Sequence, residues 1–242
     1  MSGAGRARLR SALGGISVLG VLSVASAVSV LGTRGLAHAD GVAIAAPADL
    51  LDRPEADSQA LDRLFASFRN VKNFHATFTE EKKLTLLVKP LKSDGTLYFD
   101  REHGLARHAK TPKVQKLRLT ETSLTLWNGT TVEHVNLDQS RDLSALALSF
   151  PRILRGDRPG LAKTFAMKMQ GTETAWWALT LAPTEDSLKR MLSGITIVGH
   201  GDSVQSVIVQ EANGDRTRTL FTDVHKNVQR SASETEALFR LP

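Results

Sequence analysis

The spacing of hydrophobic residues changes along the chain, and each spacing predicts a different kind of element. From Leu61 to Val71, apolar residues recur every three or four positions, which is typical of an amphipathic helix, and Asp57 or Ser58 can cap its start. After Asn73, apolar and polar residues alternate, as they do along a strand with one buried face. The alternation predicts strands at residues 74–79, 96–100, 116–120, 124–127, 131–135, 164–170, 175–182, 195–199, 205–211 and 216–224.

A second helical pattern interrupts these strands at about residues 143–154. Pro151 lies inside this segment, and because proline lacks an N–H and crowds the preceding turn, we expect it to kink the helix or split it in two. Residues 231–241, at the end of the chain, fit either one helical turn or a last strand. Tight turns are predicted at Asn128-Gly129, Gly201-Asp202 and Gly214-Asp215.

The order of these elements predicts the fold class. Roughly nine to eleven short strands follow one another with connections too short for helical crossovers, so the sheet should be antiparallel. A long antiparallel sheet must curl or close, and its concave face needs a cover. The two apolar helical segments are the candidates for that cover. We therefore expect an α+β domain in which a large curved antiparallel sheet is covered by helices.

The first 39 residues have the pattern of a secretory signal peptide. Arg6, Arg8 and Arg10 precede an apolar stretch at residues 12–31, and Ala37-His38-Ala39 offers a cleavage site. These arginines do not form a twin-arginine pair, which favours the general secretion route and a periplasmic product. The alternative is an uncleaved anchor, because the apolar stretch approaches the length that spans a bilayer. We expect a loose lead-in at residues 40–56 and one domain at 57–242.

Composition excludes several classes of function. The signal holds four arginines and no acid, so removing these four from 31 basic residues leaves 27 against 25 acidic ones, a net charge of +2. The remaining Lys and Arg are scattered among acids, which argues against nucleic-acid binding. The chain has no Cys, which excludes thiol catalysis, cysteine-ligated zinc and a lipid-anchoring cysteine.

The sequence after residue 39 contains no known catalytic or metal-binding motif. HExxH, GxxxxGK[ST], GxGxxG and GxSxG are all missing, and the histidines lack the spacing of metal ligands. Glu80-Glu81 and Glu185-Asp186 are adjacent carboxylates, which point to opposite faces of a strand and are typical of a solvated surface. We therefore expect no enzyme, no cofactor and no metal, with an exported hydrolase as a minor alternative.

Arg101 stands out because it follows Leu97 and Phe99 at a spacing of two. It ends a predicted strand on the same face as these two large apolar residues, and arginine is rarely buried unless it is paired. Two interpretations remain open. Arg101 lies either beyond the sheet edge in water, or inside, with its five N–H donors on backbone carbonyls of a neighbouring element.

Five sequence blocks in order resemble the family of outer-membrane lipoprotein carriers, LolA. They include an opening strand of the type Phe-x-Ala-x-Phe, a Gly-x-Leu strand that ends in Arg101, and a final Gly-Asp strand followed by Asn, Phe and Pro. The blocks are VKNFHATFTE at residues 71–80, GTLYFDR at 95–101, Thr111-Pro112, SLTLW at 123–127, and GDRTRTLFTDVHKN at 214–227 with Phe239 and Pro242. The resemblance covers nearly the whole predicted domain.

The resemblance implies a half-open β-barrel with lid helices over an apolar cavity, and a monomer that carries the acyl chains of lipoproteins, or related acylated lipids, from the inner to the outer membrane. It implies an ABC-type releasing complex in the inner membrane and an acceptor in the outer membrane. Arg101 matches the arginine that holds the lid in this family. A lipid-sensing or lipoprotein-sensing regulatory module on the same fold is the alternative.

The candidate cavity-lining residues share the Arg101 face or the apolar stripes of the two helical segments. They are Phe65, Phe68, Phe74, Phe78, Leu97, Phe99, Leu117, Leu119, Trp127, Phe150, Ile153 and Leu154. The chain departs from the family at Glu102, where proline is common, at Thr120 to Thr122, where an Asp-Gly turn is usual, and at Ala106-Arg107, where the family has Leu-x-Trp. A charge at an expected cavity position would narrow the pocket or meet a polar head group, which leaves the cargo open.

Overall fold

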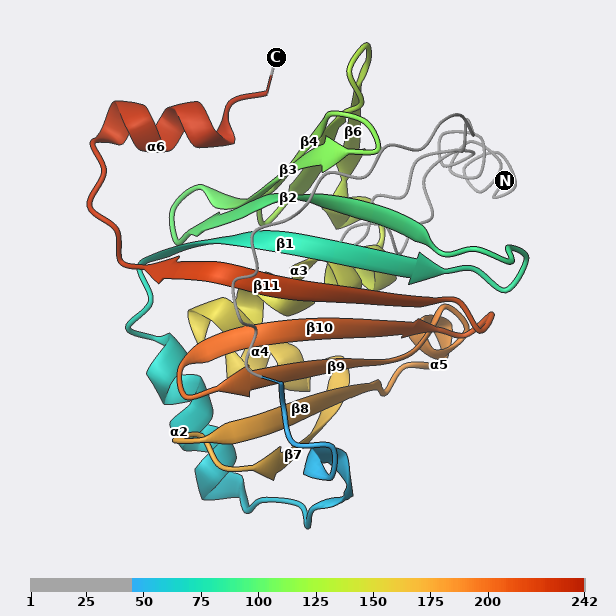
Figure 1. Ribbon diagram of the computed structural model, residues 1–242, viewed down its shortest axis with the longest axis vertical. Coiled ribbons are helices and arrows are strands. Elements are labelled where there is room, and N and C mark those ends of the chain that lie inside the picture. Colours follow the sequence, from blue (N-terminus) through green and yellow to red (C-terminus); the bar gives the residue numbers. More distant parts are fainter. Residues whose placement is uncertain (1–44, 242) are drawn as a thin grey trace.

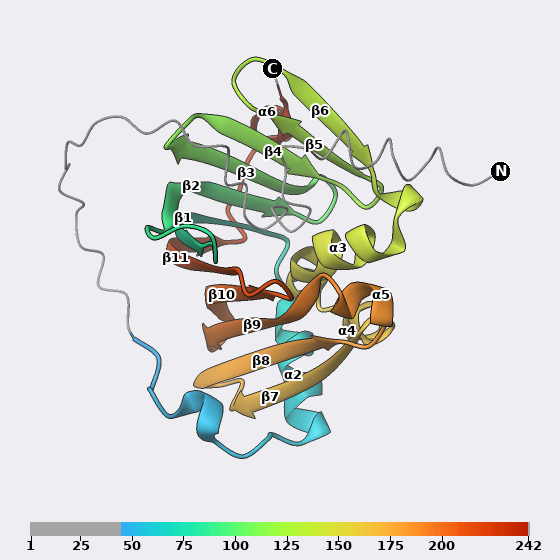
Figure 2. The same ribbon diagram turned by 90° about the vertical axis from the view of Figure 1, so that its right-hand side faces the viewer.

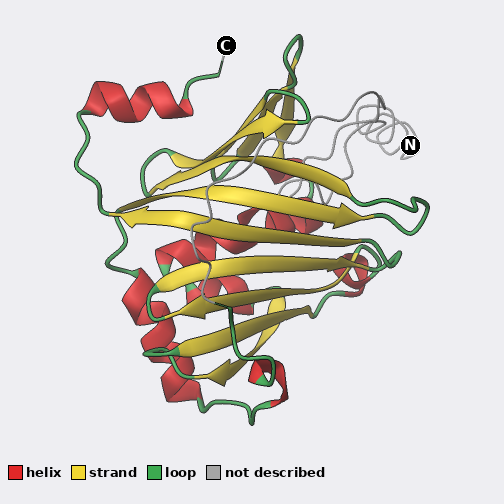
Figure 3. Ribbon diagram, in the orientation of Figure 1, coloured by secondary structure: helices red, strands yellow, loops and turns green. Residues whose placement is uncertain are grey.

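Strands dominate the fold, which a computed structural model describes for residues 45–241 (Figures 1 and 3). In this part of the chain eleven strands form one antiparallel sheet in the order β6-β5-β4-β3-β2-β1-β11-β10-β9-β8-β7. The strands are β1 (Asn73–Lys83), β2 (Leu91–Asp100), β3 (Gly104–Thr111), β4 (Gln115–Leu119), β5 (Ser123–Trp127), β6 (Val132–Asn136), β7 (Phe165–Gly171), β8 (Trp176–Pro183), β9 (Leu192–His200), β10 (Ser203–Glu211) and β11 (Arg216–Lys226). The chain therefore runs outward from β1 to β6, crosses over, and returns from β7 until β11 pairs with β1.

The helices cover the two faces of this sheet unequally. They are η1 (Leu50–Asp52), α2 (Ser58–Phe68), η2 (Leu137–Gln139), α3 (Arg141–Arg155), α4 (Arg158–Ala162), α5 (Asp186–Lys189) and α6 (Ala232–Phe239). Figure 2 shows α2, α3 and α4 together on one side of the curved sheet, with α3 in the crossover between its two halves. The C-terminal α6 lies on the other side (Figure 1). None of the helices between residues 45 and 241 has the length and apolar character needed to span a membrane.

The architecture confirms the expected α+β class and the curved antiparallel sheet. The leading helix begins where its sequence predicts, because Asp57 accepts a hydrogen bond from the amide of Ala60 at 2.7 Å. The expected signal peptide and residues 40–44 of the lead-in lie outside the described residues. The rest of the lead-in contacts the sheet, since Leu50 is buried and Glu55 forms a bridge with Gln170.

Two local predictions need correction. Of the two outcomes expected for Pro151, the split is wrong, since α3 runs without interruption from Arg141 to Arg155, and the kink stays a prediction. Most of α3 is buried between the sheet and its neighbouring helices, and this packing outweighs the hydrogen bond that proline removes. Strand β3 was not predicted from the alternation of apolar and polar residues. The alternation is broken at Arg107, which is a charged residue at an inward position of this strand.

The hydrophobic core lies between the inner face of the sheet and helices α2 and α3. Helix α2 buries the apolar stripe that predicted it, including Leu64, Phe65 and Phe68. The ring of Phe68 meets that of Trp177 on β8 edge to face, with centroids 6.0 Å apart. Since aromatic rings bury large areas, these contacts fix α2 over the β7–β9 half of the sheet.

Gly156 allows the ends of α2 and α3 to approach each other. It ends α3 in the left-handed conformation with φ of 69°, as is usual for a glycine that follows a helix. A Cβ at this position would lie 2.4 Å from the carbonyl oxygen of Phe65 in α2. Glycine is therefore required at this position for two reasons, namely the left-handed backbone conformation and the lack of room for a Cβ.

We expect Gly156→Ala to destabilise the fold more than a matched change at Gly201. Gly201 also has a positive φ, of 56°, but a Cβ there would meet nothing within 4 Å. Gly201→Ala should cost about 1–2 kcal/mol for the left-handed backbone, and Gly156→Ala about 1–3 kcal/mol more for the steric overlap. Urea unfolding of both variants measures this, and equal losses would contradict the close approach of α2 and α3.

Candidate functional site

The guanidinium of Arg101 binds the carbonyl end of helix α2. Its Nε donates to the carbonyl of Val71 at 2.7 Å, and its Nη2 donates to those of Phe68 at 3.0 Å and Arg69 at 2.7 Å. The last carbonyls of a helix lack partners within the helix, so these acceptors are available to a donor from outside. Arg101 follows the end of β2, and it therefore joins the sheet to α2.

Helix α3 reaches the same point through Arg155. The Nη2 of Arg155 donates to the carbonyl of Arg101 at 3.2 Å, and Nη2 of Arg101 lies 3.5 Å from the carbonyl of Arg155. Arg155 also forms an ion pair with Glu121, and its guanidinium carbon lies 5.7 Å from the centre of the Phe99 ring. Burial lowers the pKa of Arg155, and the nearby charge of Arg101 acts in the same direction. One arginine pair thus links β2 with both covering helices.

Asn227 holds the loop between α2 and β1 from the opposite side. Its Oδ1 accepts a hydrogen bond from the amide of Lys72 at 2.7 Å, and its Nδ2 donates to the carbonyl of Asn70 at 3.2 Å. Asn227 has a φ of 55°, a conformation that asparagine tolerates better than most residues. The end of α2 is therefore held by polar groups from β2 and from the segment after β11.

Eleven of the twelve candidate lining residues lie together in the core of the described chain, on the inner face of the sheet or on α2 and α3. They are Phe65, Phe68, Phe74, Phe78, Leu97, Phe99, Leu117, Leu119, Phe150, Ile153 and Leu154. Trp127 does not join them. It follows the inward Leu126 directly on β5, so the alternation of the strand turns its half-buried side chain to the other face.

Buried side chains of the sheet and the covering helices fill much of the described interior. A void of about 20 Å³ remains beneath α3, where Phe150 stacks on Phe221 of β11 with ring centroids 5.8 Å apart. This volume holds about one water molecule. The void is bordered by Phe78, Leu97, Leu105, Arg107, Phe150, Val207, Thr219 and Phe221. This void is far smaller than an ordinary ligand pocket.

A charged network borders this void. Arg107 on β3 is 3% exposed and its Nη2 donates to Glu80 at 3.1 Å and to the hydroxyl of Ser93 at 3.0 Å. Glu80 also accepts hydrogen bonds from Thr219 at 3.1 Å and from Ser93 at 3.2 Å. The guanidinium carbon of Arg107 lies 4.2 Å from the centre of the Phe78 ring. Burial lowers the pKa of Arg107, and the charge of Glu80 opposes that change.

A second buried ion pair lies further along the same face. Lys82 follows Glu80 at a spacing of two on β1, and its Nζ donates to Glu211 at 3.1 Å. Both side chains are almost fully buried. A buried charge is tolerated when it is paired, so the two ion pairs leave this part of the interior polar but electrically balanced.

The sequence of this chain matches a known protein family. Residues 54–241 match the family described as outer membrane lipoprotein carrier protein LolA-like. The chain belongs to that family. No curated protein sequence matches the chain.

Solved structures similar to the LolA-like protein come from several bacteria. A DUF1329 family protein from Desulfovibrio piger is 10% identical, with a TM-score of 0.43, over 74% of this chain and 94% of its own. A LolA superfamily protein from Nitrosomonas europaea is 8% identical, with a TM-score of 0.41, over 77% and 98%. The lipoprotein LppX from Mycobacterium tuberculosis is 12% identical, with a TM-score of 0.42, over 72% and 99%.

The LolA-like protein also buries residues that the sequence analysis did not select. Glu80 was expected on a solvated surface, but it is 5% exposed on the inner face. The signal was present, because Glu80 continues the spacing of Phe74, Ala76 and Phe78 by two residues. Arg155 carried no comparable signal, since its contacts join segments far apart in the sequence. Asn227 appeared only as the last residue of the block at 214–227, without a role.

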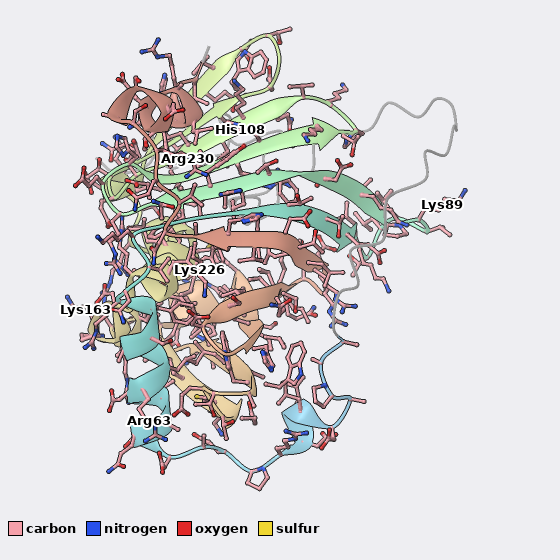
Figure 4. All side chains as sticks on the ribbon, turned by 60° about the vertical axis from the view of Figure 1, so that its left-hand side comes forward. Arg63, Lys89, His108, Lys163, Lys226 and Arg230 are labelled. Carbon is pink, nitrogen blue, oxygen red and sulfur yellow. The ribbon has the colours of Figure 1, made fainter. Side chains whose placement is uncertain are left out.

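Histidines of the LolA-like protein gather on the outer face of the sheet. His75 on β1 stacks on His225 with ring centroids 4.8 Å apart, and its Nδ1 lies 2.8 Å from Nη2 of Arg230. His108 lies on β3, where the sheet contacts α6. Figure 4 labels His108 and Arg230 on this side of the molecule. No group of side chains suited to hold a metal occurs within residues 45–241.

These histidines make the stability of the LolA-like protein sensitive to mild acid. Burial lowers the pKa of His75, assisted by Arg230 and His225, and burial lowers the pKa of His108, assisted by Lys116. A lowered pKa means that the folded chain resists protonation. The stabilising contribution is therefore complete above the ordinary value of 6.5 and is lost as the pH falls below it.

We expect the urea midpoint to fall between about pH 7.5 and about pH 5.5, and a His75→Gln, His108→Gln double variant to flatten that dependence. His134→Gln is the matched control, because the His134 side chain is exposed on β6. A double variant that kept the full pH dependence would show that other groups produce it.

Proposed function

We propose that this protein is a non-enzymatic periplasmic carrier that binds the acyl chains of lipoproteins, or of related acylated lipids, and moves them from the inner to the outer membrane. The observation on which the proposal depends is the polar joint at Arg101. It closes two helices over an apolar interior through hydrogen bonds that can break without loss of the core. Membership of the LolA-like family supports the same assignment.

The closed interior suits a carrier that must release its cargo. Exposing an acyl chain to water costs about 0.8 kcal/mol for each methylene, so the chain needs an apolar enclosure during transfer. Ligand pockets usually have roughly 300–1,000 Å³, whereas the void here has about 20 Å³. Cargo therefore enters by displacing α2 or α3 from the sheet. Closure of the empty protein then recovers the packing of Phe150 on Phe221 and favours release.

Loading requires energy from a partner. Extraction of an acyl chain from a bilayer is unfavourable, and the sequence contains no GxxxxGK[ST] nucleotide site. We propose that an ABC-type complex in the inner membrane supplies this work and that a receptor in the outer membrane accepts the cargo. The signal peptide expected at residues 1–39 would deliver the carrier to the space between these membranes.

The proposal predicts that the protein purified natively from periplasm contains acylated molecules. Mass spectrometry under non-denaturing conditions should show mass additions that disappear after extraction with organic solvent, and lipid analysis of the extract identifies them. A protein treated in the same way after complete delipidation is the control. Native protein without bound acyl species, whose interior also fails to take up an added acyl probe, would contradict a carrier function.

The joint at Arg101 predicts a defect in release. Arg101→Leu removes three hydrogen bonds from a charged donor to the end of α2, each of which contributes on the order of 1 kcal/mol. Without these hydrogen bonds, closure of the protein no longer favours release of the cargo. Uptake of acyl cargo therefore persists, while transfer to acceptor membranes slows by about tenfold or more. Transfer of a labelled lipoprotein to acceptor vesicles measures this effect.

Arg216→Leu is the control for this experiment, because Arg216 is an exposed arginine on β11, away from the covering helices. We expect its transfer rate to equal that of the unchanged protein. If Arg101→Leu transferred cargo at that same rate, Arg101 would have no part in closing the carrier.

A further inference from the structure

Arg107 combines deep burial with an unused hydrogen-bond donor. Its Nη2 is engaged with Glu80 and Ser93, but Nη1 is buried and has no hydrogen-bond partner among the described residues. Buried donors without a partner are uncommon in folded proteins and call for an explanation. Arg107 also borders the void beneath α3, which is otherwise enclosed mainly by apolar side chains.

We propose that Arg107 is the head-group residue of the interior and that its Nη1 donates a hydrogen bond to the neutral carbonyl of an acyl ester or amide. This assignment rests on the carrier function proposed above and specifies which part of the cargo is recognised. The acyl chain would lie in the space that opens beside Phe78, Leu97 and Phe150 when the void enlarges.

Charge balance favours a neutral carbonyl over a carboxylate. Arg107 is already paired with Glu80, and the neighbouring cation Lys82 is paired with Glu211. A ligand carboxylate at Nη1 would place a second anion around one guanidinium, close to Glu80 and away from water. Like charges in such a site repel strongly, whereas an ester or amide oxygen satisfies the donor without adding charge.

The polarity of the inner face also gives the ligand a direction. Along β1, inward positions change from Phe74 and Phe78 near the α2 end to Glu80 and Lys82 at the far end. The neighbouring strands follow the same order, since Phe78 pairs with Phe221 and Glu80 with Thr219. The apolar tail therefore belongs near the Arg101 joint, and the head group belongs near Arg107.

The experiment compares three ligands with similar chains, namely methyl laurate, laurate and dodecane. Each is titrated against the purified protein loaded with the fluorescent probe N-phenyl-1-naphthylamine, at about pH 8, where a carboxyl group is ionised. One hydrogen bond from a charged donor predicts that methyl laurate binds about tenfold more tightly than dodecane. Laurate is expected to bind less tightly than methyl laurate.

The decisive variant is Arg107→Met with Glu80→Gln, which removes both charges of the pair and avoids leaving one of them buried alone. Its ratio of methyl laurate to dodecane affinity should fall to about one. Lys82→Met with Glu211→Gln is the matched control, because it removes a buried ion pair of the same inner face that does not border the void. This control should keep the tenfold ratio.

The outcomes separate the two proposals. If no ligand displaces the probe from the unchanged protein, the carrier function fails and this inference fails with it. If the ligands bind but show no ester preference, if laurate binds more tightly than methyl laurate, or if both double variants lose the preference equally, the role of Arg107 is overturned while the carrier remains. The comparison of ester with acid needs only the unchanged protein, so it decides even if the Arg107 variant does not fold.

Discussion

The structure depends on covering the apolar inner face of one large curved sheet. A sheet of this size exposes far more hydrophobic surface than a stable monomer tolerates, and α2 and α3 are the elements that bury it. Packing supplies most of the stability, but the position of the cover is set by Arg101, Arg155 and Asn227, which bind backbone carbonyls and amides at the helix ends. Such a cover is specific and can still open.

Two arginines on the inner side of the sheet offset the free-energy cost of burying a charged guanidinium in different ways. Arg101 donates to backbone carbonyls at and just beyond the end of the covering helix, which have partial negative charge. Arg107 is neutralised by a full carboxylate, Glu80, within the sheet itself. A movement of the helix, as proposed for loading, would break the first arrangement and leave the second in place. The interior thus combines a contact between sheet and helix with a polar pair inside the sheet.

Much of the fold follows from local patterns, but the site follows only in part. Period-two alternation located most strands and the period of α2 located the cover, because each pattern reports a face that is buried. For Arg101 the same spacing left two positions open, in water beyond the sheet edge or inward against a neighbouring element, and only the family resemblance favoured the second. Glu80 was wrongly expected in water, since a charge in an alternating pattern is ordinarily solvated and its partner Arg107 lies on another strand. Arg107 was expected near the cavity only through the family resemblance. The spacing along β1 indicates that Glu80 faces inward, but it does not identify the partner on β3.

Long-range polar pairing also bears on the proposed carrier function, because a carrier of amphiphiles would gain from a charge pair inside. A wholly apolar interior would hold a chain in any orientation, with its polar end forced into hydrocarbon or left outside by chance. A balanced ion pair at one end of the strands gives one orientation of the bound ligand a lower free energy than the other. Only a polar group of the ligand can accept the hydrogen bond that Nη1 of Arg107 does not make within the protein. Since the Arg101 joint lies at the other end, the proposed carrier would open over the tail while Arg107 holds the head group.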